Sequence, residues 1–260
     1  MSSTTPEAEP HITVTREGRI ATVIIDRPPV NALTFDDYDS IRRAFHALSH
    51  DDTLSVVVLT GAGTRAFVAG HDVNEFAAMT PETAELGLAR VRMAFNAVQD
   101  CAVPVVAAIN GPAIGAGFAL ASLSDIRVAS ETATFAVPEI DVGVLGSGSH
   151  LMRLAPQGLT RLMVLTGRRL SARDALVAGV VEQVHPRDEV LPAAMVIARE
   201  IAAKSPKAVR LAKIGLERVE AMSAREGYEF ECSLTNTMRR SPDAVEAGRA
   251  YLERRDPSFG

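Results

Sequence analysis

The sequence predicts an α/β fold in which strand–strand–helix units repeat through the first two thirds of the chain and a helical region follows. Three observations support this fold class. Continuous apolar runs, typical of buried strands, alternate with amphipathic helical patterns. Two of those runs lead directly into glycine-bearing loops, and from residue 148 onward the pattern is helical almost to the end. With 260 residues, 47% of them hydrophobic, the chain is long enough for one large core, or for one core and a smaller appendage.

The first elements are a hairpin, a helix and a buried strand. Residues 12–16 and 20–25 alternate apolar and polar side chains around a Glu-Gly pair, which predicts a β-hairpin. The proline pair at 28–29 ends it, because proline cannot continue a ladder of hydrogen bonds. A helix is expected over 35–49, and the continuous apolar run 54–60 is typical of a buried strand.

The middle of the chain repeats this arrangement. Asp72 is expected to cap a helix, and Glu75, three residues later, would complete a capping box. A long helix over 82–100 precedes a strand at 105–109, which leads into the second glycine loop and a helix at 116–122. Short strands are expected at 125–129 and 133–137. The tail is expected to form helices near 187–204, 206–222, 224–238 and 242–255, with Pro206 and Pro242 at helix starts.

Composition excludes several classes of partner. The net charge is −5 and no block of basic residues occurs, so nucleic acid is not expected to bind. No apolar run approaches the roughly 18 residues needed to cross a bilayer, so no membrane partner is expected. Cys101 and Cys232 lie far apart in the sequence, which argues against a disulfide framework or a metal site and favours the cytoplasm.

The two glycine loops predict a shared anion-binding device. They occupy residues 61–72 and 110–117, each after an apolar strand. Glycine allows a sharp turn and close approach of a ligand, so two such loops can direct two backbone N–H groups at one carbonyl oxygen. An alternative is a dinucleotide site, because Gly115-Ala116-Gly117 follows a strand, opens a helix and supplies the G-x-G start of the dinucleotide-binding motif. That alternative lacks a well-placed acidic residue on the next strand, since Glu131 comes too early and Glu139 follows a third short strand.

Four segments in register carry a family resemblance. They are Asn31-Ala32-Leu33, Thr60-Gly61-Ala62-Gly63 continuing to Ala66-Phe67-Val68-Ala69-Gly70-His71-Asp72, Asn110-Gly111-Pro112-Ala113-Ile114-Gly115-Ala116-Gly117, and Pro138-Glu139-Ile140-Asp141-Val142-Gly143. Together they resemble the crotonase superfamily, the enoyl-CoA hydratase/isomerase family, over nearly the whole chain. The resemblance implies a crotonase (ClpP-like) spiral of ββα units with a C-terminal helical trimerisation region. The implied parts are a disordered lead-in over 1–10, a spiral core with the acyl-CoA site over 11–200, and a helical region over 201–260.

The resemblance also implies roles for individual residues. The oxyanion-binding N–H groups would belong to His71 and Ala116, and Glu139 would be the catalytic acid/base. Hydratases of the family carry a second glutamate where this chain has Ala119, and alanine cannot hold water. Ser147 stands where some members place a catalytic aspartate; it would line the acyl pocket or simply cap a helix. The residues implied to bind substrate and coenzyme A are Ala32, Ala66, Val68, Gly70, Asp72, Gly115, Pro138 and Ser147, with Arg27, Arg65 and Arg254-Arg255 as candidates for its phosphates.

These assignments predict an acyl-CoA enzyme that stabilises a thioester enolate. A single glutamate favours an isomerase that moves a proton through Glu139, and the alternatives are a hydratase with other water-holding groups, an acyl-CoA thioester hydrolase, or a catalytically silent binding member. No permanently bound cofactor is expected, because coenzyme A arrives as part of the substrate. Family members form trimers, often paired into hexamers, so a homotrimer or a dimer of trimers is expected here.

Overall fold

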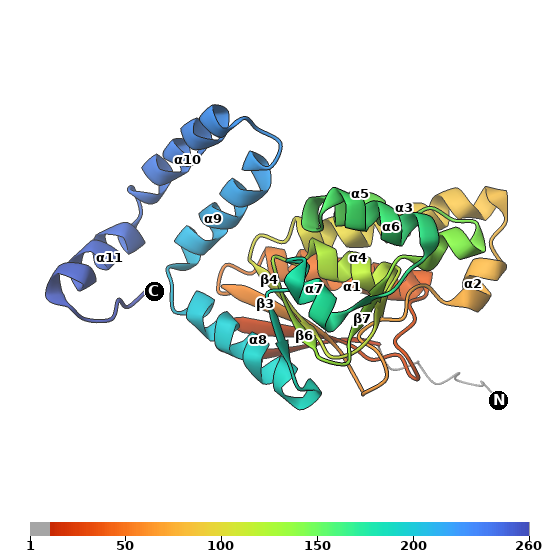
Figure 1. Cartoon of the computed structure of the whole chain (residues 1–260). Helices are drawn as coiled ribbons and strands as arrows, with labels where there is room; N and C mark the ends of the chain where they lie inside the picture. Colours follow the sequence, from red (N-terminus) through yellow and green to blue (C-terminus); the bar gives the residue numbers. More distant parts are fainter. Residues whose placement is uncertain (1–10, 260) are drawn as a thin grey trace, which may run out of the picture.

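The computed structural model describes residues 11–259, and a six-stranded sheet lies at its centre (Figure 1). The strand order is β1-β2-β3-β4-β6-β9. The first two strands pair antiparallel as the predicted hairpin, and the remaining pairs are parallel. Their bounds are β1 Ile12–Glu17, β2 Ile20–Ile25, β3 Val56–Gly61, β4 Val105–Ile109, β6 Ile126–Ser130 and β9 Gln183–His185. The lead-in expected over residues 1–10 lies outside the described residues.

A second, three-stranded sheet and a set of helices complete the architecture. The second sheet has the order β5-β7-β8, with β5 Ala113–Ile114, β7 Thr134–Ala136 and β8 Leu170–Ser171. The helices are α1 Phe35–Ser49, α2 Val73–Ala77, α3 Pro81–Gln99, α4 Ala116–Leu123, the 3-10 helix η1 Pro138–Val142, α5 Gly148–Leu154, α6 Gln157–Thr166, α7 Ala172–Val177, α8 Arg187–Ala202, α9 Pro206–Val219, α10 Ala224–Met238 and α11 Pro242–Glu253. Strands and helices therefore alternate as the α/β prediction required.

The inner strands β3 and β4 of the central sheet are buried on both faces, which explains their continuous apolar runs, whereas the edge strand β1 is largely exposed. Alternate residues of β3 point to opposite sides, so Val57 and Leu59 join the larger core with α1 and α3. Val56 and Val58 join a smaller core, where Ala194 of α8 packs against them. The helices on the two faces hold the strand ends, and the loops that follow them, in fixed positions.

Two predictions about local structure were wrong. The chain after residue 148 is not uniformly helical, because β8 pairs with β7 and β9 pairs with β6. Asp72 does cap α2, since its side chain accepts hydrogen bonds from the N–H groups of Asn74 and Glu75. Glu75 does not complete a capping box; its Oε2 instead accepts the N–H of Phe35, at 2.7 Å.

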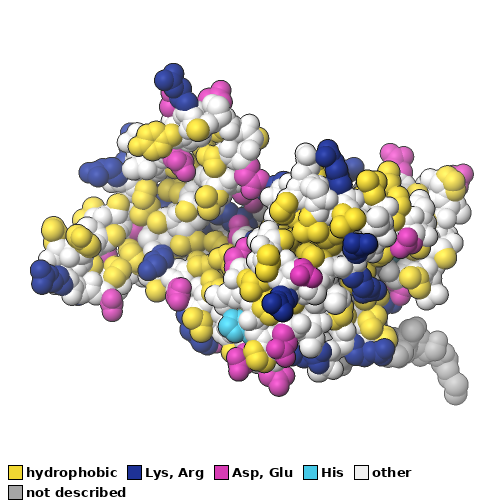
Figure 2. All heavy atoms as spheres, in the orientation of Figure 1, with side chains coloured by type: hydrophobic (Ala, Val, Ile, Leu, Met, Phe, Trp, Pro, Cys, Tyr) yellow, Lys and Arg dark blue, Asp and Glu magenta, His cyan; other side chains and the backbone are white. Residues whose placement is uncertain are grey.

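The last three helices extend away from the central sheet (Figure 1). Figure 2 shows hydrophobic side chains gathered on these helices among charged ones. Leu216, Tyr228, Tyr251 and Leu252 are among the large exposed apolar residues there. Within residues 11–259, no helix is both long and apolar enough to cross a membrane.

Lys213 attaches α9 to the sheet. Its ammonium group is buried and donates to Oδ2 of Asp125 at 2.9 Å and to the carbonyl of Val103 at 3.3 Å.

Replacing Lys213 with methionine (Lys213→Met) should lower the free energy of unfolding by about 2 kcal/mol. This loss is smaller than for a fully buried ion pair, because Asp125 keeps contact with water. Chemical denaturation measures this, and Lys207→Met, an exposed lysine of the same helix, should change stability by less than about 0.5 kcal/mol. Equal stability of the two variants would contradict this role.

Candidate active site

The two glycine loops lie side by side, joined by backbone hydrogen bonds. The N–H of Phe67 donates to the carbonyl of Pro112 at 3.0 Å, and the N–H of Ile114 donates to the carbonyl of Val68 at 3.0 Å. Gly117 is required for this approach, because a Cβ built on it would lie 2.1 Å from the Val68 carbonyl oxygen. The pairing of loops predicted from the sequence is therefore present as a physical contact.

The N–H groups of His71 and Ala116 are available for a ligand. Leu33 pairs with the peptide groups on either side of His71, since its N–H donates to the Gly70 carbonyl and its carbonyl accepts the Asp72 N–H, both at 2.8 Å. Neither the His71 N–H nor the Ala116 N–H donates to any residue in the described part of the chain. Ala116 is the first residue of α4, where N–H groups lack helical partners and the helix dipole favours negative charge.

Glu139 lies against the second of these loops. It belongs to the 3-10 helix that Pro138 begins, and its Oε1 is 3.0 Å from where a Cβ of Gly115 would stand. The same Cβ position is 3.9 Å from Cα of Gly70, so both loops and the carboxylate meet at one place. Oε2 of Glu139 is buried and accepts no hydrogen bond from residues 11–259. Burial raises the pKa of this carboxyl above its ordinary value, which suits a group that takes up and returns protons.

A cavity of about 320 Å³ adjoins Glu139. Ser147 helps to line it, together with apolar side chains such as Val137 and Val164. Ser147 occupies the N-cap position of α5 in a left-handed conformation, with φ of 58°, but its hydroxyl makes no capping hydrogen bond. The serine thus stands at a helix start without serving as an ordinary cap, and its hydroxyl is free to face the cavity.

The His71 side chain lies in an aromatic cluster that the sequence patterns did not indicate. Its ring stacks on Tyr38 of α1, with centroids 5.7 Å apart and planes 14° apart, and it also contacts Phe35 at 4.7 Å. Nε2 of His71 lies 3.3 Å from Oε2 of Glu75, without the geometry of a hydrogen bond. Burial lowers the pKa of this imidazole, which favours its neutral form. The one sequence feature that could have indicated this cluster is Tyr38, because it occupies a position on the apolar face of the helix predicted over 35–49.

The other residues predicted to bind coenzyme A lie in or beside the first loop, but the arginines predicted to contact its phosphates do not form one cluster. Ala66 and Val68 are buried in the loop, and Ala32 is half-buried beside it. Arg27 is engaged by Asp72, at 2.9 Å, and by the Ala32 carbonyl, at 2.7 Å. Arg65 is exposed within the first loop. Arg254-Arg255 lies at the end of α11, where Arg255 pairs with Glu246, so the structure of the single chain does not bring these arginines together as one basic patch.

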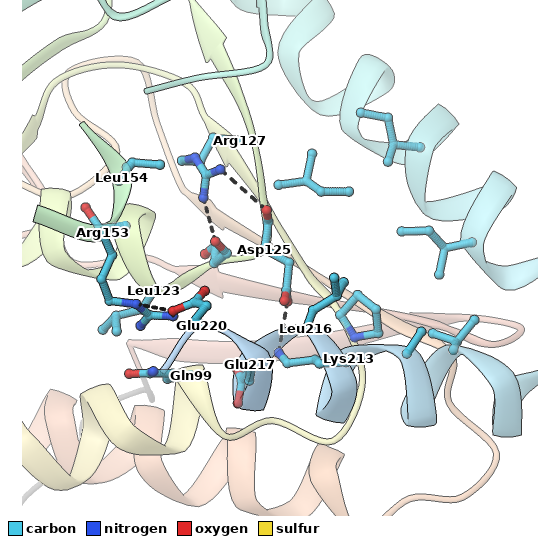
Figure 3. Close-up of a pocket in the computed structure, with 18 of the residues that line it drawn as sticks. Gln99, Leu123, Asp125, Arg127, Arg153, Leu154, Lys213, Leu216, Glu217 and Glu220 are labelled. Carbon is cyan, nitrogen blue, oxygen red and sulfur yellow. Dashed lines mark hydrogen bonds and ion pairs between the residues drawn. The ribbon is translucent and has the colours of Figure 1, made fainter. Parts of the chain in front are cut away.

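A larger cavity, of about 690 Å³, lies elsewhere, between α8, α9 and the sheet (Figure 3). Its lining carries matched charges: Lys213 pairs with Asp125, and Arg153 pairs with Glu220. None of the site residues predicted from the sequence lines it. We therefore locate the candidate site at the glycine loops and Glu139.

Comparisons with known proteins show the family of this chain and support its fold. The model of the enoyl-CoA hydratase/isomerase family matches residues 15–260. A (7aS)-7a-methyl-1,5-dioxo-2,3,5,6,7,7a-hexahydro-1H-indene-carboxyl-CoA hydrolase of Mycobacterium tuberculosis is 38% identical over 94% of this chain and 99% of its own. A carnitinyl-CoA dehydratase of Salmonella enteritidis is 34% identical over 94% of this chain and 96% of its own. The crystal structure of an enoyl-CoA hydratase from Bacillus anthracis superimposes with a TM-score of 0.93 at 30% identity, covering 96% of this chain and 98% of that one.

Proposed function

This chain belongs to the enoyl-CoA hydratase/isomerase family, also called the crotonase superfamily, and from that premise we propose that it binds an acyl-CoA thioester and forms its enolate. The N–H groups of His71 and Ala116 would hold the thioester oxygen, and Glu139 would remove the proton from the adjacent carbon. The observation that carries the proposal is the meeting of Gly70, Gly115 and the unpartnered Glu139 carboxylate at one place. Residues 60–72 would border the coenzyme A moiety.

The reaction type we favour is isomerisation of a 3-enoyl-CoA. Glu139 takes a proton from C2, and the electron pair of that C–H bond enters a dienolate whose negative charge lies on the thioester oxygen. The two N–H groups stabilise this charge, each by about 3–4 kcal/mol relative to a site without it. The protonated Glu139 then returns the proton at C4, so the double bond moves from C3 to C2. One carboxyl is sufficient for this sequence of steps.

Ala119 is the reason for placing isomerisation first. Its side chain is fully buried in α4 and offers no group that could hold or polarise water. Reactions that add water are the second candidate, because the similar proteins are named as a hydrolase and a dehydratase. In that case the water would need the Ser147 hydroxyl or the His71 imidazole, both close to the site, in place of a second glutamate.

Incubation with panels of 2-enoyl- and 3-enoyl-CoA in D₂O, read by mass spectrometry, tests the proposal. Conversion of a 3-enoyl-CoA to its 2-enoyl isomer, separated by chromatography and without gain of water, is the expected result; deuterium enters at C4 in those turnovers in which the protonated Glu139 exchanges with solvent before it returns the proton. A gain of one water without isomerisation would instead establish hydration, and release of free coenzyme A would establish hydrolysis. If no panel member is changed by the wild-type protein, or all are changed equally by Glu139→Gln, the proposal fails.

We also propose that the C-terminal helices join subunits into a homotrimer or a dimer of trimers. The exposed apolar residues of α9 to α11 support this, because a monomer would leave them in water. Sedimentation velocity at micromolar concentration should show a species of at least three chains. A stable monomer at that concentration would contradict the assembly.

A further inference from the structure

The carboxylate of Glu139 lies between two glycines that belong to different loops. Its Oε1 is 3.0 Å from the place that a Cβ of Gly115 would take and 3.3 Å from the place that a Cβ of Gly146 would take. Gly115 belongs to the second glycine loop described above, whereas Gly146 has no role in the reaction proposed so far. Gly146 also lines the cavity of about 320 Å³, so its backbone borders both the carboxylate and that cavity.

Backbone hydrogen bonds hold Gly146 beside this carboxylate. The N–H of Val144 donates to the carbonyl of Glu139 at 3.0 Å, which turns the chain back along the 3-10 helix that contains the base. One residue after Gly146, the carbonyl of Ser147 accepts the N–H of Leu151 at 3.1 Å, at the start of α5. Gly146 therefore lies between two anchored points, and these oppose its withdrawal from Glu139.

The contact at Gly146 depends on a missing side chain rather than on an unusual backbone. Its φ lies outside the left-handed region, so alanine could adopt the same conformation, whereas the φ of 53° at Gly115 would itself strain alanine. A methyl group on Gly146 would lie 3.3 Å from Oε1 and 3.5 Å from Cγ of Glu139. The first distance is shorter than an ordinary van der Waals contact, so the carboxylate would have to move by a few tenths of an ångström.

We propose that Gly146 is a positioning residue for the base: because it has no side chain, the Glu139 carboxylate can pack against Gly115 through one oxygen and keep the other free to take the proton. This inference rests on the proposed function, because it concerns how the base of that reaction is held. Oε2 is the oxygen that accepts no hydrogen bond from residues 11–259. Proton transfer depends on the exact position of such a group, and a displacement of about 1 Å can cost about 10²-fold in rate.

Gly146→Ala tests the inference, with Gly158→Ala as its control. Gly158 is an exposed glycine of α6, and a Cβ there would meet nothing within 4 Å. Gly146→Ala should lower kcat about 10-fold to 100-fold and leave the Kd of an acyl-CoA within about 2-fold, because the oxyanion-binding N–H groups are unchanged. Gly146→Val, with its larger side chain, should lower kcat further. Gly158→Ala should keep the kcat of the wild type.

Two readouts separate positioning from a general effect on the fold. The methyl group removes water from the carboxylate, which disfavours its charged form and raises its pKa, so the rise of kcat/KM with pH should move to higher pH in Gly146→Ala. In Glu139→Asp the shorter side chain withdraws the carboxylate from Gly146. Adding Gly146→Ala to Glu139→Asp should therefore lower kcat by less than about 2-fold, because the two changes act through one contact.

The outcomes distinguish this inference from the proposed function. If Glu139→Gln loses activity but Gly146→Ala and Gly146→Val keep the wild-type kcat, the inference is overturned while the acyl-CoA function stands. An equal loss on adding Gly146→Ala to the wild type and to Glu139→Asp would overturn it as well. If Glu139→Gln keeps full activity, the proposed function fails and the positioning role fails with it.

Discussion

Replacing Glu139 with glutamine should lower kcat by about 10² to 10⁴ and leave the affinity for an acyl-CoA within a few-fold. Glutamine has nearly the same shape, but its amide cannot accept and return a proton. Oε2 of Glu139 is buried and unpartnered, and among the described residues no other carboxylate lies against Gly115, where Oε1 of Glu139 is 3.0 Å from the place a Cβ would take. Steady-state kinetics with the best substrate, together with a binding titration, measure both quantities.

The pH dependence gives an independent test of the same residue. The base must be ionised, and burial raises the pKa of Glu139, so kcat/KM should rise with pH and reach half its maximum above the ordinary glutamate value of about 4.3. This rise on the acidic side of the pH profile should be missing from any residual activity of Glu139→Gln. Asp141→Asn, at an exposed carboxylate of the same 3-10 helix, should keep both the rate and this rise. Unchanged turnover in Glu139→Gln would remove this residue from the mechanism.

Replacing Ala116 with proline should cost about 10² to 10³ in kcat, because it removes one of the two oxyanion-binding N–H groups. Ala116 is the first residue of α4, a position where proline is well tolerated and where the N–H serves no helical hydrogen bond. The change should therefore affect the ligand more than the fold. The carbonyl stretch of a ¹³C-labelled thioester should also lie closer to its value in water when bound to this variant.

A matched substitution separates the loss of the N–H from the presence of proline. Ala224 is the first residue of α10, on the C-terminal helices and away from the glycine loops. Ala224→Pro should retain the activity and the melting temperature of the wild type. Full activity in Ala116→Pro, with the protein folded, would exclude its N–H from the oxyanion site.

The sequence predicted the parts of the fold that local pattern determines. The apolar runs of β3 and β4, the helix Phe35–Ser49 and the glycine loops were all recognisable, since each rests on residues close together in the chain. The strands β8 and β9 were missed because they are two or three residues long and form only by pairing with distant partners.

For the candidate site as well, the sequence indicated the residues that lie in local motifs and missed those whose role depends on packing between distant segments. Family motifs indicated His71, Ala116 and Glu139, and the structure places their loops in contact, while their catalytic roles stay predictions. Tyr38 and Glu75 were not recognised, because their relation to His71 depends on how α1 packs against the segment Val73–Ala77. Arg27 was one of the candidates for the phosphates of coenzyme A, and the structure shows that Asp72 and the Ala32 carbonyl engage its guanidinium group.

Exchange of the C2 protons of a saturated acyl-CoA in D₂O tests the central claim most directly. A saturated chain has no double bond to move or hydrate, so deuterium can enter at C2 only through an enolate. NMR should show deuterium at C2 with the wild-type protein, and neither Glu139→Gln nor Ala116→Pro should support exchange at a comparable rate. If the bound acyl-CoA keeps its C2 protons, or if exchange persists in Glu139→Gln, the enolate is not formed as described.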